Sequence, residues 1–89
     1  MGAFIARQPN GLLCRFSSVV DCPTKWNMTD EDYLNNATGT VNNREHGQDI
    51  LDNYMQPFTE VIEYFRTENM SAAEFIDFLI DVGYIELKE

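Results

Sequence analysis

The sequence predicts an α+β fold in which an N-terminal β-hairpin packs against two main helices and one short helix. Three observations lead to this prediction. A strong turn signal, Asn10-Gly11, separates two short runs that contain apolar and β-branched residues. Apolar residues then recur at helical spacing over 44–66, and the segment 72–82 is bounded by a helix start signal and a helix stop signal.

A chain of 89 residues is the length of one ordinary domain. Its apolar share of 44% is typical of globular proteins and argues against disorder. We therefore predict a single domain over 1–89, with the hairpin over 3–20, a loop and short helix over 21–43, and a helical part over 44–89.

The hairpin is predicted to have strands near 3–8 and 12–20. Alternation in the second strand places one set of residues on the face that we expect to point inward: Leu12, Cys14, Phe16 and Ser18. A lone hairpin is marginally stable, so it needs the helices or a third strand. The candidate for that third strand is Tyr84-Ile85-Glu86-Leu87.

Residues 21–43 are predicted to be loop apart from one short helix. Asp21-Cys22-Pro23-Thr24 is expected to end the second strand, and Trp26 to anchor the loop after it. Thr29 is a helix N-cap followed by three acids, which favour a first turn, so the short helix spans about 30–36. The polar segment 35–43 is rich in turn formers and is predicted to be a connecting loop.

A single long helix is predicted from about 44 to 66. At about 100° per residue its apolar side chains fall on one side: Ile50, Leu51, Tyr54, Met55, Phe58, Val61, Ile62 and Phe65. Pro57 removes one backbone hydrogen bond and so predicts a kink or a break. Because the apolar register continues across Pro57, a kinked helix is favoured over two independent ones.

The last helix has the clearest boundaries. Ser71 and Glu74 match the S-x-x-E capping box, in which each side chain accepts a hydrogen bond from the other residue's backbone. Gly83 fits the left-handed position that follows a helix. We therefore predict a helix from about 72 to 82.

The net charge of −9 is unevenly distributed. Residues 1–25 hold three cations against Asp21, a balance of +2, whereas residues 26–89 hold fourteen acids against three cations, a balance of −11. Such a field repels nucleic acids and anionic membranes and favours basic partners. Direct nucleic-acid binding and membrane association are therefore not expected.

The acids of the helical part form two stripes at spacings of three and four residues. They are the candidate partner-binding residues: Glu45, Asp49, Asp52, Glu60 and Glu63 on the long helix, and Glu74, Asp77 and Asp81 on the last one. Basic residues that would pair with them along the helix are absent from the sequence pattern, although like charges at this spacing destabilise a helix. From Asp49 to Glu63, a continuous helix would space four acids over about 21 Å, half the charge density of one DNA strand.

Catalysis, cofactors and metals find little support in the sequence. His46 lies near Glu45 and Asp49, but no second His or Cys has the spacing to complete a metal site. Cys14 and Cys22 are predicted to be buried structural thiols, with a disulfide between them as the alternative. No nucleophile–base pair or phosphate-binding loop can be assembled, so we expect neither an enzyme nor a cofactor.

Two aromatic residues, Tyr64 and Phe78, fall outside the apolar arcs, toward the acids. One interpretation makes them exposed anchors of an interface, because interfaces are enriched in aromatic residues. The alternative is that they pack against the hairpin or Trp26.

The N-terminal part of the chain resembles a known group of proteins. Residues 1–11 and Cys14-Arg15-Phe16-Ser17, continued by 20–24 and 27–33, resemble small proteins carried on prophages and conjugative elements of Gram-positive gut bacteria. The resemblance covers roughly the first third of the chain and supplies no functional residues. It implies a context, because small acidic proteins of mobile elements often resemble inhibitors of host defence, including anti-CRISPR proteins that imitate DNA.

The leading hypothesis is a non-catalytic, cytoplasmic interaction protein whose carboxylates block the basic, nucleic-acid-binding surface of a partner protein. The alternative is a regulatory adaptor, or a homodimer, in which the hairpin edge over residues 3–8 adds a strand from a partner. In that case the acids serve only solubility. The sequence leaves the choice between monomer and homodimer open.

Overall fold

The computed structural model describes residues 3–86 of the chain. Three strands come first and form one antiparallel sheet in the order β1-β2-β3, and four helices follow, so the predicted α+β class is confirmed. The elements are β1 (Ala3–Arg7), β2 (Leu13–Ser17), β3 (Cys22–Met28), α1 (Asp30–Leu34), α2 (Arg44–Asn53), α3 (Thr59–Tyr64) and α4 (Ala72–Asp81).

The predicted hairpin is present, with Ala3 opposite Ser17 and Arg7 opposite Leu13. Its connection is longer than the two-residue turn that Asn-Gly suggests. The backbone N–H of Gln8 donates to the carbonyl of Leu12, and of the loop residues between them only Gly11 has a positive φ, at 89°. A left-handed glycine at the end of the loop is typical of three-residue hairpin loops.

The third strand is β3, not the C-terminal segment, so the predictions for 21–24, Trp26 and 84–87 are wrong. Residues 84–86 form no strand, and residue 87 lies outside the described part of the chain. β3 pairs with β2 through a register that shifts twice, between Leu13 and Arg15 and between Arg15 and Phe16. Pro23 is tolerated in it because β3 is an edge strand, where one side of the backbone needs no ladder hydrogen bonds.

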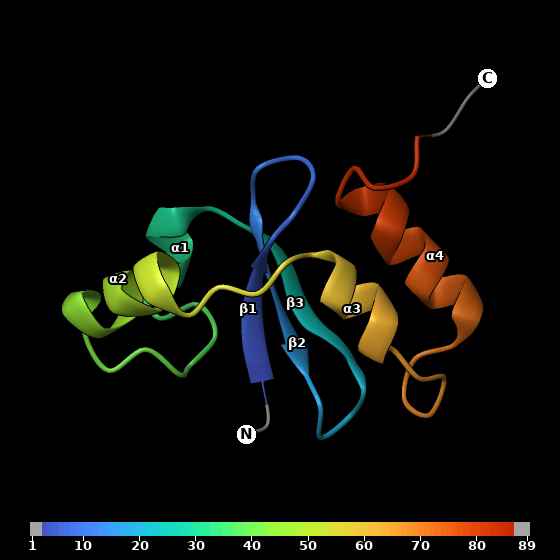
Figure 1. The fold of residues 1–89 in the computed structure, drawn as a ribbon, viewed down its shortest axis with the longest axis horizontal. Coiled ribbons are helices and arrows are strands. Elements are labelled where there is room, and N and C mark those ends of the chain that lie inside the picture. Colours follow the sequence, from blue (N-terminus) through green and yellow to red (C-terminus); the bar gives the residue numbers. More distant parts are fainter. Residues whose placement is uncertain (1–2, 87–89) are drawn as a thin grey trace.

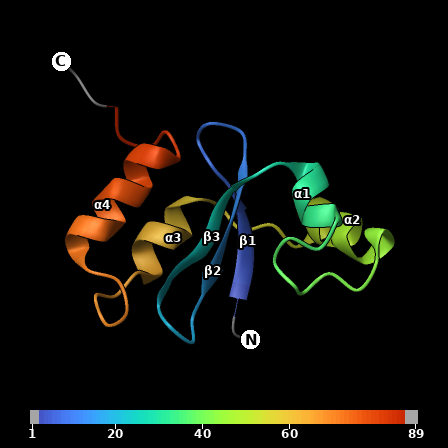
Figure 2. The same cartoon turned by 180° about the vertical axis from the view of Figure 1, so that it is seen from behind.

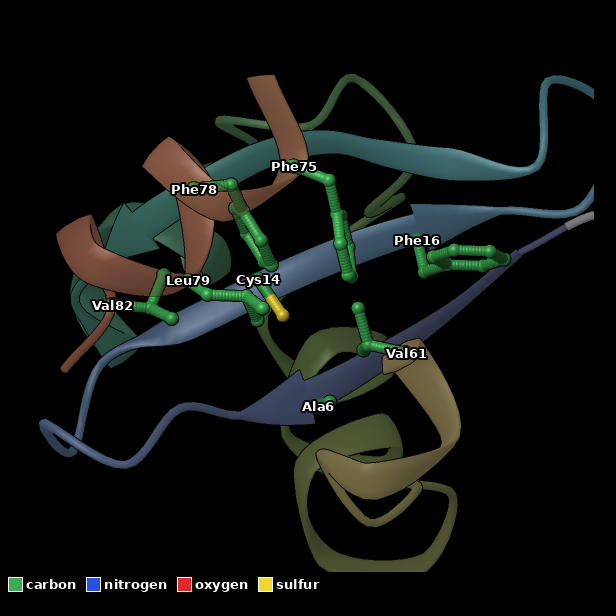
Figure 3. Close-up of a cluster of buried hydrophobic side chains, with 8 residues drawn as sticks. All are labelled: Ala6, Cys14, Phe16, Val61, Phe75, Phe78, Leu79 and Val82. Atoms are coloured by element: carbon green, nitrogen blue, oxygen red, sulfur yellow. The ribbon is translucent and has the colours of Figure 1, made fainter. Parts of the chain in front are cut away.

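Helices cover both faces of the sheet, so the prediction of one inward face is wrong. One cluster of buried side chains joins β1 and β2 to α3 and α4: Ala6, Cys14, Phe16, Val61, Phe75, Phe78, Leu79 and Val82 (Figure 3). The other joins the sheet to the α1–α2 side: Ile5, Leu13, Met28, Tyr33 and Val41. Neighbouring strand residues such as Ile5 and Ala6 belong to different clusters because successive side chains point to opposite faces.

The predicted long helix over 44–66 is two helices, and the prediction of a kinked but continuous helix is wrong. Between α2 and α3 the chain crosses the outer edge of β1, where the backbone N–H of Gln56 donates to the carbonyl of Ile5 at 3.0 Å (Figure 1). Ile50 and Leu51 then pack on the α1–α2 side, whereas Phe58 and Ile62 pack on the other. The apolar stripe therefore divides between the two faces of one sheet.

The predicted helix caps are confirmed. Thr29 and Asp32 form a capping box that opens α1, and Ser71 and Glu74 form one that opens α4. Gly83 follows α4 with a φ of 85°, as its left-handed role requires. These short-range signals depend on a few neighbouring residues, which is why the sequence predicts them well.

The two helix pairs lie at opposite ends of a flat molecule. The principal extents are 41 × 29 × 19 Å, and α1 and α2 occupy one end of the longest dimension while α3 and α4 occupy the other (Figures 1 and 2). The sheet stands between them, so any surface built from one pair is separated by the sheet from a surface built from the other.

Candidate interaction surface

The eight candidate carboxylates lie on three helices. Seven are exposed and Glu60 is half-buried: α2 carries Glu45, Asp49 and Asp52, α3 carries Glu60 and Glu63, and α4 carries Glu74, Asp77 and Asp81. The structure does not bring them into one surface. Because α2 lies on the opposite side of the sheet from α3 and α4, the acids of α2 form one group and the other five form a second (Figures 1 and 2).

The predicted stripe from Asp49 to Glu63 does not exist as one line of charge. Its expected length of about 21 Å assumed a continuous helix at 1.5 Å per residue, but the chain leaves the helix after Asn53. The helices α3 and α4, which carry the other five acids, are neighbours at one end of the molecule (Figures 1 and 2).

None of the eight carboxylates forms an ion pair within residues 3–86. The two ion pairs of the described chain use acids of α1 instead: Arg7 pairs with Asp30 at 2.6 Å, and Arg44 pairs with Glu31 at 2.8 Å. These pairs join α1 to β1 and to α2. They lower the pKa values of Asp30 and Glu31, first through the hydrogen bonds from the arginines and then through the arginine charges.

The remaining described arginines are directed elsewhere. Arg66 donates to the backbone carbonyls of Glu63 and Phe65 at 3.1 and 2.8 Å, and so terminates α3 instead of pairing with a carboxylate. Arg15 donates to the hydroxyl of Thr24. The acids of α2, α3 and α4 therefore keep their charge uncompensated by side chains of the described chain.

Neutral groups position some of these carboxylates. Asp52 accepts a hydrogen bond from the Gln48 amide at 3.0 Å, and Asp49 accepts one from the Asn53 amide at 2.8 Å. Hydrogen bonding to Ser71 in the capping box, first to its backbone N–H and then to its side chain, holds the pKa of Glu74 below its usual range. These contacts fix side chains on the surface without reducing their charge.

The arrangement lowers helix stability. Each of the three helices carries at least one acid pair at a spacing of three or four residues, and neither α2 nor α4 has a basic residue in its last turn. Each like-charge pair at this spacing destabilises a helix by roughly 0.2–0.5 kcal/mol. An acid at the negative end of a helix, such as Asp81 of α4, is unfavourable as well.

The α3–α4 unit, meaning these two helices with the aromatic residues between them, is held together by stacked aromatic rings. Phe65 stacks on Phe75 with ring centroids 3.8 Å apart, and Phe58 stacks on Phe78 at 6.1 Å. Phe78 is buried and contacts Trp26, so it is not an interface anchor. The other predicted anchor, Tyr64, is 49% exposed.

Ile76 of α4 departs from the apolar face to which its spacing assigns it. It is 49% exposed and follows Phe75, which is buried. The α3–α4 unit thus carries five carboxylates, one exposed tyrosine and one exposed isoleucine on its surface. Exposed aromatic and large aliphatic residues among charges are typical of interface centres with a polar rim.

The structure adds three observations on other chemistry. Within residues 3–86, no group of three or more His, Cys, Asp or Glu side chains is arranged to hold a metal ion, and no helix is long and apolar enough to cross a membrane. Cys14 and Cys22 are both buried and free. Burial raises the pKa of the Cys14 thiol to about 12, so Cys14 is a structural thiol at neutral pH.

The sequence reasoning missed a cavity on the α1–α2 side of the sheet. Its lining includes Arg15, Tyr33 and His46, which are far apart in the chain and have no motif spacing. The one available signal is Arg15 itself, a charged residue within the apolar strand β2.

No protein-family model matches the chain, and comparison with curated proteins and with solved structures finds no match either. The class of protein is therefore defined here by fold and surface alone. It is a small α+β domain with a three-stranded sheet between two helix pairs and a strongly acidic helical surface.

Proposed function

We propose that this protein is a non-catalytic inhibitor that occupies the basic, nucleic-acid-binding surface of a partner protein with its acidic α3–α4 unit. The observation that carries the proposal is that five carboxylates on two adjacent helices have no cationic partner within residues 3–86. Solubility alone would not require acids at spacings that destabilise their own helices. A basic partner surface supplies the missing counter-charges.

Tyr64 and Ile76 give this unit contacts that charge alone does not provide. Electrostatic complementarity mainly speeds association and selects partners, whereas affinity depends on a few large buried side chains. Both residues are exposed on the unit that carries most of the carboxylates. The resemblance of the N-terminal third to proteins of prophages and conjugative elements makes a defence nuclease of the host a fitting partner.

The geometry gives less support to strand addition at the hairpin edge. Gln56 already bridges to β1 at Ile5 and Ala6, so an added strand would have to displace the crossing segment 54–58. A dimer through this edge requires the same displacement.

Three variants of equal charge test the proposal. The first neutralises the α3–α4 unit (Glu60→Gln, Glu63→Gln, Asp77→Asn), the second neutralises α2 (Glu45→Gln, Asp49→Asn, Asp52→Asn), and the third is a control that neutralises acids outside the three helices (Asp21→Asn, Glu68→Gln, Glu86→Gln). Glu74 is left unchanged because it caps α4. Only the first variant is expected to lose its partner. Equal loss of partner binding in all three variants would mean that only the net charge matters, and it would contradict a defined binding surface.

A further inference from the structure

A cavity of about 510 Å³ lies on the α1–α2 side of the sheet, away from the α3–α4 unit. Small-molecule sites typically have volumes of about 300–1,000 Å³ and combine apolar walls with a few polar groups. Here the apolar lining includes Ala3, Ile5 and Ile50, and the polar lining consists of Arg15, Tyr33, Thr40, His46, Tyr54 and Gln56.

The charge of this cavity is opposite to that of the molecule. The chain has fifteen acids and a net charge of −9, yet no Asp or Glu of residues 3–86 lines the cavity, while an arginine and a histidine do. A site that excludes carboxylates and retains a guanidinium is suited to an anion.

Arg15 has donors to spare. Within residues 3–86 its guanidinium makes one hydrogen bond, from Nη1 to the Thr24 hydroxyl at 3.1 Å, and no ion pair. The two arginines that do pair with carboxylates, Arg7 and Arg44, pair with acids of α1. A guanidinium presents five N–H donors in a planar fork that matches carboxylate and phosphate groups.

Tyr33 provides a second unused group. The residue is only 3% exposed and lines the cavity, and its hydroxyl makes no hydrogen bond to any residue of 3–86. Burial raises the pKa of Tyr33 and the charge of Arg15 partly opposes this effect, so the phenol lies within electrostatic range of the guanidinium. No buried side-chain oxygen or nitrogen of residues 3–86 lacks a partner, so this unpaired hydroxyl is accessible to solvent and free to bond a ligand in the cavity.

His46 supplies a third donor. Its Nδ1 accepts a hydrogen bond from the backbone N–H of Asn42 at 3.2 Å. In a neutral imidazole, the proton is then on Nε2, which is left as a donor on a side chain that lines the cavity.

We propose that this cavity binds a small molecule that joins one carboxylate or phosphate group to a compact apolar ring. The anionic group is held by Arg15 and Tyr33, and the ring packs on Ile5 and Ile50. The cavity lining includes Tyr33, His46 and Ile50 of α1 and α2, which lie across the sheet from the α3–α4 unit (Figures 1 and 2), and the site does not depend on the function proposed for that unit.

The test is an NMR titration of the ¹⁵N-labelled full chain with four probes up to about 10 mM, a concentration that detects millimolar affinities. The probes are phenyl phosphate, benzoate, inorganic phosphate and benzyl alcohol. Phenyl phosphate or benzoate is expected to give saturable shifts at Arg15, Tyr33 and His46, and the tighter of the two identifies the anionic group. Inorganic phosphate and benzyl alcohol should each bind about tenfold more weakly, because each lacks one half of the ligand.

Two variants complete the test. Arg15→Gln is expected to weaken binding about tenfold or more, and Tyr33→Phe about threefold to tenfold, whereas the control Arg66→Gln on the α3 side leaves it unchanged. Tyr33→Phe keeps the buried ring, so it remains informative even if Arg15→Gln, which also loses the Thr24 contact, does not fold. Absence of saturable shifts with both aromatic anions, equal binding of benzyl alcohol, or wild-type affinity in Tyr33→Phe would overturn the proposal.

Discussion

Replacing Pro57 with alanine distinguishes the observed crossing segment from a kinked helix, because the two arrangements predict changes of opposite sign in the free energy of unfolding. If 44–66 were one helix, removing an internal proline would relieve a defect worth about 3 kcal/mol and raise stability. In the structure, Pro57 is exposed between α2 and α3, and the neighbouring Gln56 N–H is bonded to Ile5 of β1. Alanine then brings no helical hydrogen bond and only increases the freedom of the unfolded chain.

The expected effect of Pro57→Ala is therefore a loss of about 0.4–1 kcal/mol in the free energy of unfolding. For a domain of this size, that loss lowers the Tm by roughly 2–8 °C. Urea and thermal unfolding followed by far-UV circular dichroism measure both stability and helix content. Pro9→Ala, in the exposed hairpin loop, is the matched control and should show a similar small loss. A Pro57→Ala variant that is more stable and more helical than the wild type would refute the crossing.

Three further predictions concern the core and the caps. Burial keeps the Cys14 thiol protonated in the folded chain, while the unfolded chain releases this proton above its ordinary pKa of 9.0. The free energy of unfolding therefore keeps its full value below about pH 9 and falls above it, by about 1.4 kcal/mol at pH 10. Cys14→Ala should remove this part of the pH dependence between about pH 8 and 10 in urea unfolding, and an unchanged slope would contradict it. Phe78→Ala should lower the unfolding free energy by about 3–5 kcal/mol, because Phe78 is fully buried against Trp26 and Phe58; a loss below about 1 kcal/mol would argue against that packing. Ser71→Ala should cost about 1 kcal/mol by removing the α4 cap, and unchanged melting would contradict the capping box.

The parts of the fold that the sequence predicts correctly depend on neighbouring residues. The Thr29 and Ser71 caps and the Gly83 stop each act within a few positions, and all are present; the Asn-Gly signal places the hairpin connection correctly, although the loop has three residues. Their energies do not depend on which face of the sheet a helix later covers. For these elements local signals were therefore sufficient, and the element boundaries differ by a few residues.

The parts of the fold that are not predicted from the sequence depend on contacts between residues far apart in the chain. Pro23 and Asn27, whose φ is 60°, make β3 look like a loop, and only pairing with β2 and packing of Trp26 on Phe78 make it a strand. The apolar register across Pro57 fits one helix equally well as two segments on opposite faces. Sequence periodicity does not distinguish these arrangements, because either one can pack the stripe on the sheet; in the structure every member except Tyr54, which is 60% exposed, joins one of the two clusters.

For the candidate surface, the sequence predicts the charges and their lack of partners along each helix, but not their grouping. The division into three acids on α2 and five on the α3–α4 unit follows from the crossing segment. The exposure of Ile76 and the cavity around Arg15 and Tyr33 require the packed structure, because their residues come from separate elements.

The most direct test of the central claim is capture of partners from a lysate of a Gram-positive gut bacterium by the wild type and the three charge-matched variants. Capture is carried out at about 50 and about 300 mM salt, between which screening of exposed charges increases strongly, and bound proteins are challenged with double-stranded DNA. We expect capture of a nucleic-acid-binding protein that is released by salt and by DNA, retained by the control variant and lost with the α3–α4 variant. A partner that stays bound to the α3–α4 variant, or that DNA does not displace, would contradict the claim.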